Sequence, residues 1–243
     1  MNIKDFLNKV SDFLVINYLL PKSKILYAQS GEDLILSHLF TKLGIDNPNY
    51  LDIGANDPRF ISNTYKLYRK GSMGVLVEPN PTLCNLLKKK RPRDTVLNFG
   101  VGINNINKAK FYLFPKDSNG LSTFSEKDAM YWQEVGMKGH GKIYFEDIIE
   151  VDLVPINEIL YKYFISQKKS IDFISLDVEG LDLDILRSID FNTFKPKVIC
   201  VETLQYSLNQ LEQKNEEIIS FLLENNYLIY ADTHVNTIFL LND

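Results

Sequence analysis

The stretch YLDIGANDP, residues 50–58, combines a short apolar strand with a glycine-bearing turn that has acidic residues on both sides. Gly54 allows the backbone to approach a ligand closely, and a helix that starts after Ser62 directs its N-terminus towards the same crevice. A second apolar strand follows about one helix later and ends at Glu78. Because an acid at that position can accept both hydroxyls of a ribose, the two strands predict a site for a nucleotide-sized ligand.

Apolar strands alternate with helical patterns along the chain, which predicts an α/β fold with a parallel sheet. Four of the predicted strands end in an acidic residue, namely Asp52, Glu78, Asp177 and Glu202. The carboxyl ends of neighbouring parallel strands face one crevice, so we expect these acids to surround a single site. One or two of them have the alternative role of helix caps.

Two of these acids, Asp177 and Glu202, end neighbouring strands and form a candidate site for Mg²⁺ or Mn²⁺. Such an ion would hold a substrate hydroxyl and favour its deprotonated form. The alternative is a histidine that takes the proton, with Asp177 positioning the reactants. The candidates are His140, which lies between two glycines, and His234, in the C-terminal turn. Either histidine is otherwise an ordinary solvated loop residue.

The chain of 243 residues is long enough for one large α/β domain, and its composition is that of an ordinary globular protein. A net charge of −4 argues against nucleic acid as the main partner, because a phosphate backbone requires clustered basic residues. The basic run 88–91 is interpreted as the solvated end of a helix. Cys84 and Cys200 are interpreted as reduced core residues, which predicts a cytoplasmic protein.

Residues 1–26 carry apolar side chains at helical spacing and predict an amphipathic helix. Their apolar run is shorter than the roughly 20 residues that a bilayer crossing needs, so no transmembrane segment is predicted. We expect this helix to dock on the rest of the fold or on a second subunit, with association to a membrane surface as the alternative. An insertion at about residues 115–142 combines glycine and polar residues with aromatic ones, which is typical of a lid over a substrate.

The C-terminus contains two predicted strands, joined by a turn too short for a parallel crossover. The last strand is therefore predicted to be antiparallel. The turn after residue 53 also lacks the full Gly-x-Gly-x-x-Gly pattern of dinucleotide-binding proteins. Both features argue against a nicotinamide-dependent oxidoreductase.

Six motifs occur in the order that one protein family shows: AQSGED (28–33), LDIGAN (51–56), SNT (62–64), VEPNP (77–81), LDVEG (176–180) and NTIF (236–239). As a set they resemble the FkbM-type S-adenosylmethionine-dependent methyltransferases. The resemblance implies a methyltransferase domain over residues 27–243. Its fold would be the Rossmann-like class I methyltransferase fold, a mostly parallel seven-stranded sheet with the last strand antiparallel and helices on both faces.

The resemblance also implies an O-methyltransferase that uses S-adenosylmethionine. Its substrate would be a small molecule or a saccharide, with the methyl group going to a hydroxyl of a sugar, a phosphorylated precursor or a natural-product intermediate. Such enzymes belong to the biosynthesis of surface polysaccharides or secondary metabolites. The alternative is a non-catalytic scaffold protein of the same fold in such a pathway.

By resemblance, Asp52, Gly54 and Asn56 approach the methionine part of the cofactor and Glu78 its ribose. Pro58 stands where many family members have glycine and stiffens this turn. We expect further polar side chains to line the cofactor site: Gln29, Asn63, Asn80, Asn98 and Asp177. The alternative role of the asparagines at 63 and 80 is to cap the helices that follow them.

Overall fold

The computed structural model describes residues 25–103, 106–136, 141–178, 180–206 and 212–242. The amphipathic helix predicted over residues 1–26 therefore lies outside the described residues, apart from its last two positions. Within the part that is described, no helix combines the length and the apolar character needed to cross a membrane.

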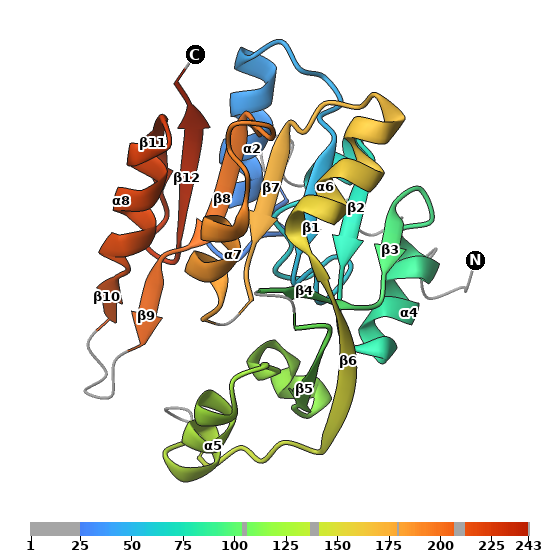
Figure 1. The fold of residues 1–243 in the computed structure, drawn as a ribbon, viewed down its shortest axis with the longest axis vertical. Helices are drawn as coiled ribbons and strands as arrows, with labels where there is room; N and C mark the ends of the chain where they lie inside the picture. The colour runs from blue at the N-terminus through green and yellow to red at the C-terminus, as the bar shows by residue number, and fades with distance from the viewer. Residues whose placement is uncertain (1–24, 104–105, 137–140, 179, 207–211, 243) are drawn as a thin grey trace, which may run out of the picture.

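A seven-stranded sheet forms the centre of the domain (Figure 1), in the order β11-β12-β8-β7-β1-β2-β3. Its strands are β1 (Tyr50–Ile53), β2 (Gly74–Val77), β3 (Thr95–Leu97), β7 (Phe173–Leu176), β8 (Val198–Glu202), β11 (Tyr227–Asp232) and β12 (Asn236–Leu241). The strand β12 runs opposite to the other six and pairs antiparallel with both β8 and β11, while the remaining pairs of this sheet are parallel. The predicted class I methyltransferase fold, with an antiparallel last strand, is confirmed.

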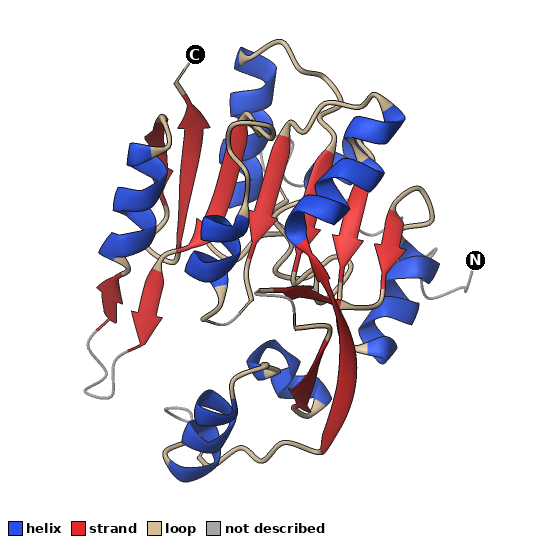
Figure 2. Cartoon of the chain, viewed as in Figure 1, coloured by secondary structure: helices blue, strands red, loops and turns tan. Residues whose placement is uncertain are grey.

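Helices cover both faces of this sheet (Figure 2). One face packs against α6 (Ile156–Tyr163), α7 (Asp182–Ser188) and α8 (Glu216–Glu224), and the other against α2 (Glu32–Lys42), α3 (Tyr65–Lys70) and α4 (Pro81–Lys90). A short 3₁₀ helix, η3 (Ile165–Gln167), follows α6. Side chains of a strand alternate between the two faces, so Leu51 and Ile53 enter the first core while Tyr50 enters the second. Both cysteines are buried and unpaired, as predicted.

The insertion between β3 and α6 is a small folded unit rather than an aperiodic loop. It contains β4 (Gly100–Gly102), β5 (Lys108–Leu113), η2 (Lys116–Leu121), α5 (Glu126–Glu134) and β6 (Asp147–Pro155). Its three strands pair in the order β4-β6-β5, and Tyr112, Phe114 and Ala129 form its core. The unit lies beyond the carboxyl ends of β1, β2 and β7 (Figure 1).

Two details of the sequence-based assignment are wrong. The apolar pattern of residues 95–101 predicts a single strand, but the chain leaves the main sheet after Leu97 and β4 pairs with β6. A Cβ at Gly100 would lie 2.5 Å from the Phe124 ring and 2.7 Å from the Leu153 side chain, so any larger residue would have to displace these side chains. The sequence also predicts a helix from about residue 210 to residue 225. Instead β9 (Leu204–Tyr206) and β10 (Glu212–Lys214) form a hairpin, and α8 starts only after Asn215.

Candidate active site

The turn after β1 brings the carboxyl ends of β1 and β7 into close contact. Gly54 has a φ angle of +80°, and a Cβ at this position would lie 1.8 Å from the backbone oxygen of Asp177. Its backbone N–H donates to the carbonyl of Val77 at 3.0 Å, which holds the turn against β2. Asn56, two residues on, also has a positive φ of 46°. Glycine is therefore needed because the neighbouring strand leaves no room for a side chain.

Glu78 lies directly after β2 with its carboxylate buried beside this turn. Its Oε2 accepts the backbone N–H of Asn56 at 2.8 Å, and its Oε1 accepts that of Asn80, also at 2.8 Å. Burial raises the pKa of Glu78 to about 7. The two N–H donors act in the opposite direction and lower this pKa, but burial is the larger effect. Each carboxylate oxygen keeps a second lone pair, so the group can still accept the two hydroxyls of a ribose.

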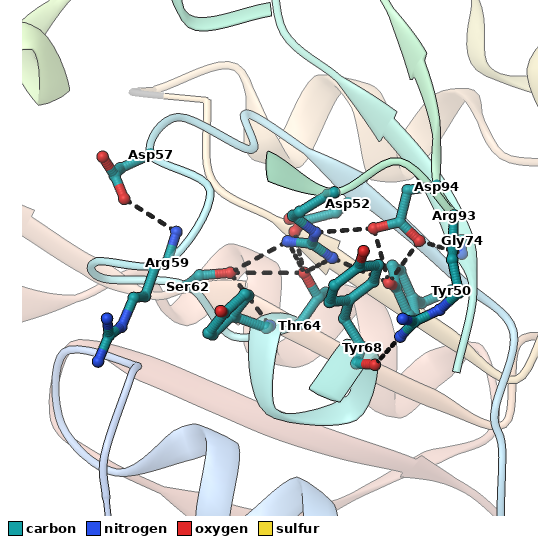
Figure 3. Close-up of polar contacts among 12 residues, drawn as sticks. Tyr50, Asp52, Asp57, Arg59, Ser62, Thr64, Tyr68, Gly74, Arg93 and Asp94 are labelled. Atoms are coloured by element: carbon teal, nitrogen blue, oxygen red, sulfur yellow. Dashed lines mark hydrogen bonds and ion pairs between the residues drawn. The ribbon is translucent and has the colours of Figure 1, made fainter. Parts of the chain in front are cut away.

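The carboxylate of Asp52 lies in an internal network rather than alone at the crevice (Figure 3). Its Oδ2 accepts the hydroxyl of Thr64 at 2.5 Å, and the same hydroxyl oxygen accepts two guanidinium N–H groups of Arg91 at 3.0 Å. Burial raises the pKa of Asp52, and the nearby Arg91 charge lowers it. In this structure Asp52 connects β1 to the start of α3.

Arg91 itself was missed by the sequence analysis, which placed it on a solvated helix end. Its side chain is fully buried and lies over the rings of Tyr50 and Tyr68. Its Nε donates to Asp94 at 2.7 Å, and its Nη2 donates to the hydroxyl of Tyr50 at 2.9 Å. The acid three residues after the arginine is the sequence signal that could have revealed this pair.

The structure brings Asp177 and Glu202 together at the ends of β7 and β8, where their side chains share a hydrogen bond. The pKa of Asp177 rises to about 7, because burial and the charges of Asp182 and Asp52 disfavour its ionised form. Within the described residues, no group of three or more histidine, cysteine, aspartate or glutamate side chains is placed to hold a metal ion. The pair thus has the predicted proximity, and no third side chain of these four types in the described part of the chain completes a metal site with it.

Asp182 is a second residue that the sequence analysis did not select. Its carboxylate accepts the backbone N–H groups of Val178 at 3.2 Å and Gly180 at 3.3 Å, and so shapes the turn that follows Asp177. Burial raises its pKa to about 6. A cavity of about 60 Å³ opens beside it and is lined in part by Glu202, Leu204 and Asn215.

The three predicted asparagines each make defined contacts. The Nδ2 of Asn63 donates to Ser175 Oγ at 3.2 Å and to Cys200 Sγ at 3.8 Å, between β7 and β8. Asn80 has the alternative role predicted for it: it caps α4, and its side chain accepts N–H groups of the first turn. Asn98 is exposed, and its amide donates at 2.9 Å to the carbonyl of Glu78, which holds β3 against the end of β2.

Of the other predicted site residues, two are exposed and one lies outside the described residues. Gln29 is exposed in the segment before α2. His234 is exposed on the turn between β11 and β12, with a φ of 75°, and its N–H donates to Asp232 at 2.7 Å. His140 lies outside the described residues.

Glu32, the first residue of α2, connects the two ends of the domain. Its buried carboxylate accepts the hydroxyl of Thr233 at 2.5 Å and the Nδ2 of Asn236 at 3.0 Å, across 204 positions of sequence. It also accepts the N–H of Ser30 at 2.8 Å. Its charge acts on the Asp177 carboxyl, which places Glu32 close to the strand ends.

The insertion reaches both turns of the crevice. A Cβ added to Gly120 of η2 would lie 3.8 Å from the side-chain nitrogen of Asn56. A Cβ on Gly180 would lie 3.7 Å from a carboxylate oxygen of Asp128, on α5. The insertion therefore borders the turn after β1 and the turn after β7.

Comparison with known proteins gives one family and a set of distant structures. The sequence model of the methyltransferase FkbM domain matches residues 52–229. Among solved structures, the precorrin-6y C5,15-methyltransferase of Geobacter metallireducens aligns with 13% identity over 91% of this chain and 92% of its own, with a TM-score of 0.44. The O-methyltransferase of Bacillus cereus, in complex with S-adenosylhomocysteine, aligns with 13% identity over 95% and 94%, with a TM-score of 0.43. No curated protein sequence matches the chain.

Proposed function

The chain belongs to the FkbM methyltransferase domain family, and on that premise we propose that it is an S-adenosylmethionine-dependent O-methyltransferase. Its acceptor is a hydroxyl of a sugar, a phosphorylated precursor or a natural-product intermediate in the synthesis of a surface polysaccharide or secondary metabolite. The observation that carries this proposal is the Glu78 carboxylate, held by two backbone N–H groups beside the Gly54 turn. This arrangement supports a ribose-binding role for Glu78.

The residues around this turn suit the cofactor that the family uses. Glu78 binds the ribose hydroxyls, and the turn at Gly54 and Asn56 faces the methionine part. Asp52 stabilises this turn through the hydrogen bond that its carboxylate accepts from the Thr64 hydroxyl. When bound, S-adenosylmethionine supplies an electrophilic methyl carbon and keeps the bonding electron pair on sulfur after transfer.

The neighbouring carboxyl pair, Asp177 and Glu202, provides a proton acceptor for the hydroxyl that receives the methyl group. As the O–H bond breaks and the O–CH₃ bond forms, the proton passes to Asp177, whose raised pKa of about 7 suits a proton acceptor near neutral pH. Glu202 orients this carboxyl through their shared hydrogen bond. Most of the rate enhancement comes from alignment of the hydroxyl with the methyl group.

A metal-assisted route receives less support. Within the described residues, no third histidine, cysteine, aspartate or glutamate side chain joins Asp177 and Glu202 to hold a cation. We therefore assign no step to a metal ion. His234 remains an alternative proton acceptor, because it lies on the turn that leads into β12.

Titration calorimetry with S-adenosylmethionine tests the proposed cofactor site. Replacement Glu78→Ala removes a charge-assisted contact and should weaken binding by about 1.5 to 3 kcal/mol. Glu224→Ala, at the exposed end of α8, is the matched control and should bind as the wild type does. Unchanged affinity in a folded Glu78→Ala variant would remove this residue from the site.

Transfer of an isotope-labelled methyl group separates the enzyme from the scaffold alternative. The wild-type protein should bind S-adenosylhomocysteine and also move label into an acceptor. Binding without transfer, tested against extracts that contain the pathway's metabolites, would favour the scaffold.

A further inference from the structure

Asn236, the first residue of β12, has one side-chain atom that its surroundings leave unpaired. The residue is 4% exposed and stands opposite Glu202 in the pairing of β12 with β8. Its Nδ2 donates to Glu32 at 3.0 Å, its backbone N–H donates to the Thr233 hydroxyl at 3.3 Å, and its carbonyl accepts the Thr233 backbone N–H at 2.9 Å. Its Oδ1 has no hydrogen-bond partner among the described residues. A buried carbonyl oxygen without a donor is costly, so it is a place where a ligand gains by supplying one.

The orientation of this amide is fixed by Glu32. The Glu32 carboxylate already accepts from Ser30 and Thr233, so it requires a donor from Asn236 as well. A turned amide would set the Asn236 oxygen against a carboxylate oxygen, which repels it. Glu32 therefore holds the NH₂ group of Asn236 towards its carboxylate, and the Oδ1 of Asn236 points away from Glu32.

The position of Asn236 in the sheet places it beyond the proposed cofactor site. β12 is the third strand from β1 and the fourth from β2 in the sheet order. At about 4.8 Å between strands, Asn236 lies roughly 14 Å from β1 and 19 Å from β2. Between them stand β7 and β8, which end in the Asp177–Glu202 pair. A ligand at this end of the sheet therefore lies beyond the proposed cofactor site, on the side of the acid pair.

We propose that Asn236 Oδ1 binds the methyl acceptor by accepting a hydrogen bond from it, so that the acceptor presents a hydroxyl or ammonium donor here and carries no phosphate at this end. The proposal rests on the methyltransferase function proposed above. The side chains near Asn236 agree with it, because Glu32, Asp177 and Glu202 are all acidic. A phosphate would meet like charges at this place. The cation Lys214 does not offset these charges, because its ammonium group already donates hydrogen bonds to Thr203 and Asp232.

The first experiment asks which class of molecule is methylated. Wild-type protein is incubated with methyl-labelled S-adenosylmethionine and a small-molecule extract of its source cells, and the products are passed over an anion exchanger before and after phosphatase treatment. Label in neutral or cationic products supports the proposal. Where phosphatase is needed to release the label, mass spectrometry locates the phosphate: a phosphate beside the methylated oxygen overturns the proposal, and one at the far end of the molecule agrees with it.

The second experiment tests the residue itself. Asn236→Leu keeps the approximate size of the side chain but removes the oxygen, and should lower transfer at limiting acceptor by about tenfold, the loss of one hydrogen bond. Thr237→Val, the next residue on the opposite face of β12, is the matched control and should transfer normally. Its hydroxyl pairs with Thr203 at 2.7 Å, so it too loses a buried polar contact. The affinity for S-adenosylhomocysteine should be the same in both variants and the wild type.

Glu32→Gln provides a variant that keeps the shape of the cluster. The amide that it introduces can pair with either orientation of Asn236, so the Oδ1 is no longer fixed and transfer should fall while S-adenosylhomocysteine affinity stays constant. Full transfer in Asn236→Leu or in Glu32→Gln overturns the proposal, and so does a wild-type protein that binds S-adenosylhomocysteine but yields no labelled product. A wild-type protein that does not bind S-adenosylhomocysteine refutes the proposed function as well, so the two failures are distinguishable.

Discussion

Arg91 and Asp94 form an ion pair in which neither side chain is exposed, with Nε and Oδ2 2.7 Å apart. The Asp94 carboxylate also accepts the hydroxyl of Tyr50 at 2.8 Å and the backbone N–H of Gly74 at 2.9 Å (Figure 3). The pair thus joins the end of α4 to the first residues of β1 and β2. Through Thr64, Arg91 also reaches the strand that ends in the Gly54 turn.

Removal of one member of this pair should be strongly destabilising. Arg91→Met leaves the Asp94 charge buried and uncompensated, and should lower the free energy of unfolding by about 3 to 5 kcal/mol in urea titrations. Lys89→Ala, on the exposed side of the same helix turn, should change it by less than about 0.5 kcal/mol. In a double-mutant cycle, adding Asp94→Asn to Arg91→Met should cost much less than Asp94→Asn alone. Independent effects would argue against the pair.

The glycine of the first turn should tolerate no side chain. Gly54→Ala combines a positive φ with a Cβ 1.8 Å from the Asp177 carbonyl, and should lower the free energy of unfolding by about 3 kcal/mol or more. Gly44→Ala also has a positive φ, of 72°, but no atom lies within 4 Å of its Cβ. Gly44→Ala should lower the free energy of unfolding by only about 1 kcal/mol, because the positive φ is its sole cost. Equal losses in both variants would show that contact with Asp177 does not matter.

The stability of the protein should fall as the pH rises. Burial raises the pKa of Glu78 from 4.5 to about 7, so the folded protein holds this proton more tightly than the unfolded chain. The associated stabilisation is complete below about pH 4.5 and is lost as the pH rises through 7. For Glu78 the loss is roughly 3 kcal/mol, and Asp177 and Asp182 add to it in the same direction. Urea titrations at about pH 5 and pH 8 measure it.

Glu78→Gln is the variant that assigns this pH dependence. A neutral amide has no proton to lose, so the variant should show a shallower fall in the free energy of unfolding between the two pH values. A pH dependence identical to that of the wild type would mean that Glu78 ionises normally in the folded protein.

The insertion should behave as a lid whose order depends on ligands. Because α5 and η2 border the turns after β1 and β7, binding of S-adenosylhomocysteine together with an acceptor should slow amide exchange in residues 126–134 by about tenfold. Exchange in α8, on a different part of the fold, should stay the same. Equal protection of α5 with and without ligands would make the insertion a fixed structural unit.

Removal of divalent cations should leave methyl transfer intact. Asp177 is the proposed proton acceptor, and no third histidine, cysteine, aspartate or glutamate side chain among the described residues joins it and Glu202, so prolonged chelator treatment is expected to preserve the rate. Asp177→Asn should lower the rate by two or more orders of magnitude, because the proton acceptor is lost. Activity that disappears in chelator and returns with Mg²⁺ or Mn²⁺ would restore the metal hypothesis.

The sequence by itself determined the main sheet and the positions of the strand-end acids. Strand periodicity, the glycine turn at Gly54 and the Asn80 cap are encoded by neighbouring residues, and local rules detect them. The short C-terminal turn likewise required an antiparallel last strand, which β12 confirms. Because carboxyl ends of parallel strands meet at one edge, the proximity of Asp177 and Glu202 also followed from topology.

Only the tertiary structure decided which polar groups are buried and what they contact. Arg91 has the sequence context of an exposed helix end, but Asp94 and the Tyr50 hydroxyl give its charge buried partners. Glu32 and Asn236 are 204 positions apart and meet because β12 inserts beside β8 and faces the start of α2. The unpaired oxygen of Asn236 follows from that contact alone. Such pairings depend on distances between separate elements, and no local pattern of residues specifies them.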